Sequence, residues 1–107
     1  MINENRVLGL IGISTKAGKI SFGTESVKET ITKNKAKLVI VAEDASDRLK
    51  KNIMYECENF KVPIVTFSTI EKLSKSIGKT NKAVICIRDK NLSEEIYKII
   101  CGGGAIG

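Results

Sequence analysis

The chain has 107 residues, enough for one domain with a single sheet covered by helices but too few for two hydrophobic cores. It carries 18 Lys and Arg residues against 12 Asp and Glu residues, which gives a formal net charge of +6. A basic balance of this size in a small domain favours a polyanionic partner, with added solubility as the alternative explanation.

The cysteines and the hydropathy pattern indicate an intracellular protein. Cys57, Cys86 and Cys101 are odd in number, widely spaced and unaccompanied by any His, so we expect free thiols and no zinc site. The N-terminus has no apolar run before a small-residue cleavage site, and no segment approaches the roughly 18 apolar residues of a membrane span. We therefore predict a soluble cytoplasmic protein without a cofactor, a metal or a membrane partner.

Hydrophobic spacing in the first half of the chain alternates between the helix and strand periods. We expect a helix over 3–15, capped by Asn3, and a short strand over 20–22 after a basic turn. A second helix is expected to open with Thr24 as its N-cap. The continuous aliphatic run that begins at Lys37 predicts a strand buried on both faces of a parallel or mixed sheet.

A third helix is expected to start near Ser46 and to bury one apolar stripe. The spacing assigns that stripe to Leu49, Ile53, Met54, Cys57 and Phe60. After this helix, Pro63 directly precedes a strand expected over 64–67, and a missing N–H group is tolerated at the start of a strand.

Cap signatures mark the last two helices. Ser68 and Glu71 form a capping-box pair for a fourth helix, which Gly78 closes. An apolar strand over 83–87 follows. Asn91 then repeats the cap signature before a final helix.

The order of these elements, α-β-α-β-α-β-α-β-α, predicts an α/β protein with helical connections long enough for crossovers. We expect a three-layer α/β/α sandwich around a four-stranded mixed sheet. A single domain over 1–101 would be followed by a flexible glycine-rich tail over 102–107.

The acidic and small residues after the Lys37 strand are the first candidates for function. In open α/β sheets, ligands usually bind beyond the carboxyl ends of the strands, which is where Glu43 to Ser46 would lie. The alternative is a polar turn that leads into a helix.

The sequence offers little for an enzyme. It has no His, no obvious carboxylate pair, and no Ser or Cys in a recognisable nucleophile setting. The segment GISTKAGKI at 12–20 is a poor match to a phosphate loop, because five residues separate its glycines and Ile20 replaces the required Ser or Thr. We expect no catalytic activity.

A nucleic-acid interface fits the basic N-terminal third better. Five residues would crowd the start of the second helix, namely Lys16, Lys19, Gly23, Thr24 and Lys28. Free backbone N–H groups and the helix dipole favour a phosphate oxygen there, and lysines add a sequence-independent electrostatic attraction. The alternative is a solvated basic face.

Four runs carry a resemblance to a known family: KAGKISFGT at 16–24, AKLVIVAEDAS at 36–46, VPI at 62–64 and IGK at 77–79. In order and at family spacing over nearly the whole chain, they resemble the L7Ae family of ribosomal proteins that bind kink-turn RNA, specifically its small bacterial branch. The resemblance implies an α/β/α sandwich that binds RNA with the start of the second helix and nearby loops.

The recognition segment departs from the family pattern. In members that recognise a kink-turn, the Gly-led segment continues with an Asn, a Glu and, three residues further, a Lys, which read the tandem sheared G·A pairs and hold the backbone. Gly23 matches, but the three positions hold Glu25, Ser26 and Glu29. Lys28 is displaced by one residue, roughly 100° around a helix.

The loop after Gly78 departs as well. Family binders place aliphatic residues there against a flipped-out nucleotide, whereas this chain has Lys79, Thr80, Asn81 and Lys82. Both departures weaken the specific kink-turn contact. RNA binding itself is not weakened, because Lys79 and Lys82 add phosphate-directed charge.

We therefore expect an RNA-binding protein, associated with the ribosome or with structured RNA, that makes mainly backbone and shape contacts. Its contact residues would be Lys16, Lys19, Gly23, Thr24, Glu25, Ser26, Lys28, Lys79 and Lys82, with Glu43, Asp44 and Ala45 shaping the adjacent loop. Its partners would be structured RNA, ribosomal RNA above all, and ribosomal proteins, with the protein itself a monomer. The alternative is a protein-interaction module on the same scaffold that has lost specific kink-turn recognition.

Overall fold

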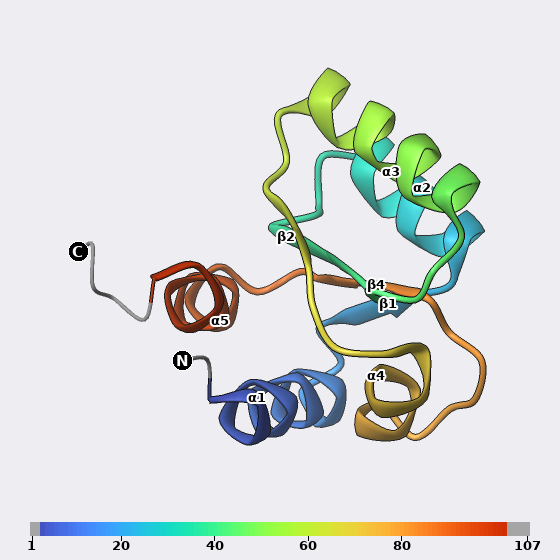
Figure 1. Ribbon diagram of the computed structural model, residues 1–107. Helices are drawn as coiled ribbons and strands as arrows, with labels where there is room; N and C mark the ends of the chain where they lie inside the picture. The colour runs from blue at the N-terminus through green and yellow to red at the C-terminus, as the bar shows by residue number, and fades with distance from the viewer. Residues whose placement is uncertain (1–2, 103–107) are drawn as a thin grey trace.

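The computed structural model describes residues 3–102. Its elements are α1 (Glu4–Lys16), β1 (Ile20–Phe22), α2 (Thr24–Thr32), β2 (Leu38–Val41), α3 (Asp47–Phe60), β3 (Ile64–Thr66), α4 (Ile70–Ser76), β4 (Val84–Ile87) and α5 (Lys90–Gly102). Helices α2 and α3 cover one face of the sheet, and α1, α4 and α5 cover the other (Figure 1). The predicted order and the three-layer α/β/α sandwich are confirmed.

The direction of the strands creates two different edges of the sheet. The strands lie in the order β1-β4-β2-β3, with β4 antiparallel to both of its neighbours and β2 parallel to β3. Strands β1, β2 and β3 therefore end at one edge, which we call the carboxyl edge, where β4 begins. At the opposite edge, the amino edge, these three strands begin and β4 ends.

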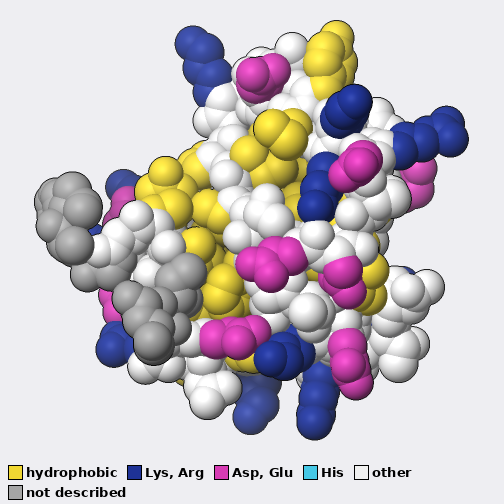
Figure 2. Space-filling model, in the orientation of Figure 1, with side chains coloured by type: hydrophobic (Ala, Val, Ile, Leu, Met, Phe, Trp, Pro, Cys, Tyr) yellow, Lys and Arg dark blue, Asp and Glu magenta, His cyan; other side chains and the backbone are white. Residues whose placement is uncertain are grey.

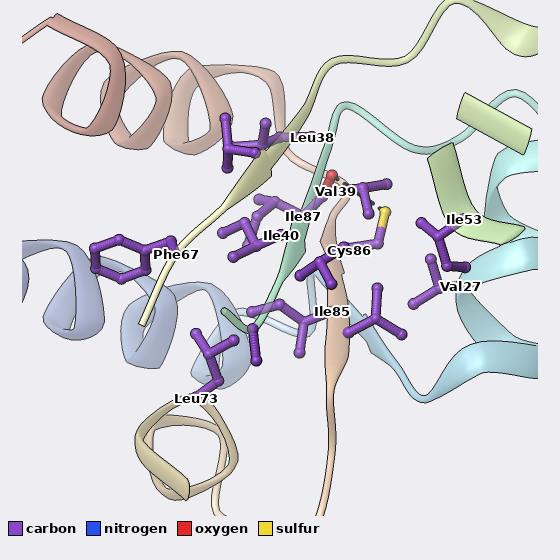
Figure 3. Packing of buried hydrophobic residues seen from close by; sticks show 14 of the residues in the cluster. Val27, Leu38, Val39, Ile40, Ile53, Phe67, Leu73, Ile85, Cys86 and Ile87 are labelled. Atoms are coloured by element: carbon purple, nitrogen blue, oxygen red, sulfur yellow. Dashed lines mark hydrogen bonds between the residues drawn. The ribbon is translucent and has the colours of Figure 1, made fainter. Parts of the chain in front are cut away.

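The core lies on both faces of the two central strands, because β2 and β4 are buried along their whole length. The register pairs Val39 with Cys86, and both side chains point toward α2 and α3 (Figure 3). The next pair, Ile40 with Ile85, points toward the opposite helical layer (Figure 3). The prediction of a strand buried on both faces is confirmed.

The third helix buries a narrower stripe than predicted. Ile53 and Cys57 are buried and Leu49 is partly buried, but Met54 is 53% exposed and Phe60 lies largely at the surface. Residues four apart share a face of a helix, whereas Met54 follows Ile53 by about 100° and turns away from the sheet. Including Met54 and Phe60 in the buried stripe was wrong.

Helix caps agree with the sequence at α1 and α3. The side chain of Asn3 accepts a hydrogen bond from the amide of Arg6 at 3.1 Å, and the Ser46 hydroxyl accepts one from the amide of Leu49 at 3.1 Å. Each bond satisfies one of the amides that have no partner within the helix.

The predicted cap of α4 is wrong by one residue. Thr69 caps the helix by accepting a hydrogen bond from the amide of Lys72 at 3.1 Å. Ser68 instead adopts a left-handed conformation with φ of 62°, and its hydroxyl donates to the carboxylate of Glu4 at 2.7 Å. The Ser68 side chain therefore bonds to a residue of α1 and does not cap α4 as the local sequence pattern predicted.

The predicted cap of α5 is also displaced. Asp89 accepts a hydrogen bond from the amide of Leu92 at 2.8 Å, so Asn91 lies inside the helix rather than at its start. The helix continues through Gly102, the first residue of the expected tail, and 103–107 lie outside the described residues. Within residues 3–102, each helix is too short or too polar to span a membrane.

Candidate nucleic-acid interface

Loops that are distant in the sequence meet at the carboxyl edge. The amide of Gly23, after β1, donates to the carbonyl oxygen of Val84 in β4 at 3.0 Å. The amide of Glu43, after β2, donates to the carbonyl oxygen of Ser68, after β3, at 2.8 Å. The sheet thus gathers the start of α2, the loop before α3, the loop before α4 and the loop before β4.

The start of α2 has no side-chain cap among the described residues. Its N-cap is Gly23 rather than the predicted Thr24, and Gly23 has φ of 86° and ψ of 152°, a conformation nearly restricted to glycine. Apart from Gly23 and its two chain neighbours, no heavy atom of the described residues lies within 4 Å of where a Cβ on Gly23 would be. The first amides of α2 are therefore accessible to an external acceptor at the positive end of the helix dipole.

Two lysines of the loop before β4 lie beside this helix start. The Nζ atoms of Lys79 and Lys82 lie 5.2 Å and 5.5 Å from the centroid of the Phe22 ring, and Phe22 directly precedes Gly23. Both distances are typical of cation–π contacts. The arrangement places two cations next to uncapped amides, and both groups attract anions.

The buried Ser74 of α4 holds this lysine loop in place. Its hydroxyl accepts a hydrogen bond from the amide of Lys82 at 2.7 Å and donates to the carbonyl oxygen of Lys82 at 3.2 Å. Its own carbonyl oxygen accepts a bond from the amide of Lys79 at 2.8 Å. Both lysines are therefore fixed at their backbones before any ligand arrives, which lowers the entropy lost on binding.

The acidic loop after β2 makes hydrogen bonds with the starts of α3 and α4. A carboxylate oxygen of Asp44 accepts a hydrogen bond from the amide of Ile70, at the start of α4, at 2.8 Å. The Nζ atom of Lys50 donates to the carbonyl oxygen of Glu43 at 2.7 Å, and Ala45 is buried. These contacts tie the starts of α3 and α4 together, and the exposed carboxylates would repel a phosphate that approached them directly.

The remaining predicted residues of α2 differ in exposure. Glu25 and Ser26 are exposed in the first turn, whereas Lys28 is partly buried. The carboxylate of Glu29 lies 3.0 Å from the Nζ atom of Lys33, one turn further along the helix. This exposed ion pair offsets the charge of Glu29 but adds little stability.

Lys16 and Lys19 do not lie at the start of α2, so this part of the prediction is wrong. The carbonyl oxygen of Lys19 accepts a hydrogen bond from the amide of Arg88 at 2.8 Å, which places Lys19 at the amino edge. Strand β1 separates Lys19 from Gly23, and a rise of about 3.3 Å per residue puts their Cα atoms roughly 13 Å apart. Lys16 ends α1, which packs in the opposite helical layer from α2.

Two residues that position the site were missed in the sequence. The ring of Phe22 makes the cation–π contacts with Lys79 and Lys82. Its only local signal in the sequence is an aromatic side chain directly before Gly23. Ser74 gives no local signal, since its partners lie in the following loop and only the fold shows that it is buried.

Comparisons with known proteins agree on one family. The family model described as "Ribosomal protein L7Ae/L30e/S12e/Gadd45 family" matches residues 5–97. The chain is 32% identical over 100 residues to the RNA-binding protein YlxQ of Enterococcus faecium, an alignment that covers 94% of this chain and 96% of the relative. It is 32% identical over 101 residues to the large ribosomal subunit protein eL8 of Thermoplasma acidophilum, covering 91% of this chain and 81% of that protein.

Solved structures share the fold over most of the chain. A protein with unknown function from Bacillus halodurans superposes with a TM-score of 0.86 at 26% identity, covering 90% of this chain and 97% of that one. The 15.5kD RNA binding protein of Giardia lamblia superposes with a TM-score of 0.75 at 25% identity, covering 87% and 83%.

Proposed function

Because this chain belongs to the ribosomal protein L7Ae/L30e/S12e/Gadd45 family, we propose that it binds structured RNA through the carboxyl edge of its sheet. Its relatives in Bacillus subtilis and Enterococcus faecium, 30% and 32% identical, are both named RNA-binding protein YlxQ. The Giardia lamblia structure is likewise titled as an RNA binding protein. The resemblance found in the sequence is thus confirmed at the level of the family.

The single observation that carries the proposal is the uncapped start of α2 beside two fixed lysines. A phosphate oxygen would accept hydrogen bonds from the first amides of α2, where the helix dipole favours a negative charge. Lys79 and Lys82, which lie over Phe22, would neutralise the adjacent phosphates. The glycine at position 23 lets the RNA backbone approach closely, since no Cβ projects there.

The proposed contacts are mainly to the RNA backbone. Glu25, Ser26 and Glu29 stand where family members read G·A pairs with Asn, Glu and Lys, so the same base contacts are not available. Binding through phosphates predicts strong salt dependence and little response to replacement of the G·A pairs. We propose that the protein acts as a cytoplasmic monomer on ribosomal or other structured RNA, beside ribosomal proteins and without a catalytic step.

The test compares a kink-turn RNA with the same RNA carrying replaced G·A pairs, across a salt series. We expect similar affinities for both RNAs and a steep decrease with salt. Lys79→Ala and Lys82→Ala should each weaken binding to both RNAs and reduce the salt slope by roughly one. Lys51→Ala is the matched control, because Lys51 is an exposed lysine of α3.

Equal binding by the Lys79→Ala, Lys82→Ala and Lys51→Ala variants would contradict the proposed surface. A clear preference for intact G·A pairs would instead mean that specific kink-turn recognition survives with a different set of contacts.

A protein-interaction module is the second candidate, and exposed side chains on α3 favour it. Met54 and Tyr55 are 53% and 63% exposed on this helix. A stable dimer in light scattering, together with purified protein free of RNA and without affinity for either test RNA, would support this function over the first.

A further inference from the structure

A groove at the amino edge has no part in the proposed interface. It lies between α5 and the starts of β2 and β3 and has a volume of about 290 Å³. Leu38, Pro63 and Tyr97 form its apolar wall. Figure 2 shows hydrophobic side chains exposed in this region. Small-molecule sites are apolar clefts of this kind with a few polar groups, and the groove is near the lower end of their size range.

One wall of the groove contains a polar atom without a partner. Ser93 is only 5% exposed, and among the described residues its hydroxyl has no hydrogen-bond partner. A buried hydroxyl in this state is unfavourable, because it has lost water without gaining a replacement. Ser93 lines the groove but its oxygen is closed to solvent, so its side chain must turn toward the groove before a polar atom of an occupant can supply the missing bond.

Charged side chains at the rim indicate what kind of occupant fits. Lys37 and Lys98 both line the groove and are exposed, and Glu94 is the acidic residue beside them. Lys37 and Lys19 lie on either side of the end of β4 and form a basic row along the amino edge. The amide of Lys37 donates to the carbonyl oxygen of Ile87 in β4, and Lys19 directly precedes β1, which pairs with the other side of β4. The rim therefore attracts an anion, while the wall favours a flat apolar surface.

We propose that this groove binds one unstacked nucleotide of single-stranded RNA. The base packs against the Tyr97 ring and Pro63, the hydroxyl of Ser93 bonds to the edge of the base, and Lys37 and Lys98 neutralise the flanking phosphates. Aromatic rings at the surface commonly bind single strands in this way, and Tyr97 is 43% exposed. The carboxylate of Glu94 accepts hydrogen bonds from an exocyclic amino group, which favours cytosine over uracil.

The inference rests on the proposed function only in its choice of RNA as the partner, since the two surfaces lie at opposite edges of the sheet. A six-residue oligocytidylate is the probe for the groove, and its binding to Lys79→Ala shows whether the carboxyl edge contributes. Binding is measured by fluorescence anisotropy of the labelled oligonucleotide. A blunt-ended kink-turn RNA without single-stranded ends tests the carboxyl edge separately.

Matched variants separate base stacking from general charge. Tyr97→Ala should weaken oligocytidylate binding at least about fivefold, the lower limit for losing one stacked base. Tyr55→Ala is the control, because Tyr55 is the other exposed tyrosine and lies on α3. Ser93→Ala should also weaken binding, and Lys37→Ala and Lys98→Ala should each reduce the salt slope by about 0.7.

Equal binding by Tyr97→Ala and Tyr55→Ala would overturn the proposal. Competition by tripolyphosphate as effective as that by the oligocytidylate would also overturn it, because charge alone would then explain binding. So would an acidic peptide that binds the groove when the oligonucleotide does not. Loss of blunt-RNA binding in Lys79→Ala, with oligocytidylate binding intact, would leave both surfaces standing as separate sites.

Discussion

The hydroxyl of Ser74 makes two hydrogen bonds with the backbone of Lys82, accepting from its amide at 2.7 Å and donating to its carbonyl oxygen at 3.2 Å. This exchange joins α4 to the loop that carries Lys79 and Lys82 over Phe22. Ser74 is buried, so it holds the proposed RNA contacts in place without reaching a ligand itself.

We predict different effects on stability for alanine at two buried serines. Ser74→Ala should lower the free energy of unfolding by about 1–3 kcal/mol, because it leaves both backbone groups of Lys82 without their partner. Ser93→Ala should leave it unchanged or raise it by up to about 1 kcal/mol, because the hydroxyl that it removes has no partner among the described residues. Urea unfolding measures both changes, and a Ser74→Ala variant as stable as Ser93→Ala would contradict the role of Ser74.

Two glycines should respond to alanine in opposite directions. Gly23→Ala should lower the free energy of unfolding by about 1–3 kcal/mol, because φ of 86° is strained for a residue with a Cβ. Gly9→Ala should raise it by about 0.5–1 kcal/mol, since Gly9 is inside α1 and, beyond its chain neighbours and the backbone of its own helix, no heavy atom of the described residues lies within 4 Å of the added carbon. Thermal and urea unfolding of the pair provide the test. A neutral Gly23→Ala variant would mean that the start of α2 adopts another conformation.

The three cysteines should differ in reactivity. Cys101 is exposed, whereas Cys57 and Cys86 are buried. Burial raises the pKa of Cys57 to about 11 and that of Cys86 to about 12, so little reactive thiolate forms at either site near neutral pH. We expect a thiol reagent to modify one cysteine in the folded protein and three in denaturant, as counted by mass spectrometry. Rapid modification of Cys86 in the folded protein would contradict the buried sheet.

The free energy of unfolding should fall at alkaline pH because of the buried thiols of Cys57 and Cys86. Their pKa values are higher in the folded protein than the usual value of 9.0, so the unfolded chain loses these protons first as the pH rises. Below about pH 9 both thiols are protonated in the folded and unfolded chains, so they do not make the free energy of unfolding depend on pH. Above about pH 9 the free energy of unfolding falls with rising pH, until the pH passes the pKa values of the folded protein. Unfolding at pH 8, 9 and 10 measures the slope. Cys86→Ala should flatten it, whereas Cys101→Ala should keep it.

Restoring the family's recognition pattern should restore base recognition. The triple variant Glu25→Asn, Ser26→Glu and Glu29→Lys places the three side chains of the family pattern in α2, after Gly23 in the sequence. We expect it to prefer the kink-turn RNA with intact G·A pairs over the RNA in which they are replaced. Glu29→Lys alone changes the net charge by the same amount and should raise affinity for both RNAs equally. A triple variant without preference would contradict the expectation that these three side chains are sufficient for base recognition.

Local pattern was enough to predict elements whose partners are close in the chain. The caps at Asn3 and Ser46 are examples, because each side chain bonds to an amide three residues later. The same reasoning placed Ser68 wrongly as a cap, since its hydroxyl bonds to Glu4, a residue from the other end of the chain. Competition from a distant partner is invisible in a local window of sequence.

By itself, the sequence determined the order of helices and strands, the strand from Leu38 to Val41 buried on both faces, and membership of the family. Those features depend on hydrophobic period and on motif spacing, which are properties of the chain alone. Only the tertiary structure decided which cations meet at the start of α2. A strand extends by about 3.3 Å per residue, so Lys19 lies at the far edge from Gly23 despite its closeness in sequence. Strand pairing brings the remote Lys79 and Lys82 onto Phe22, because β4 begins where β1 ends.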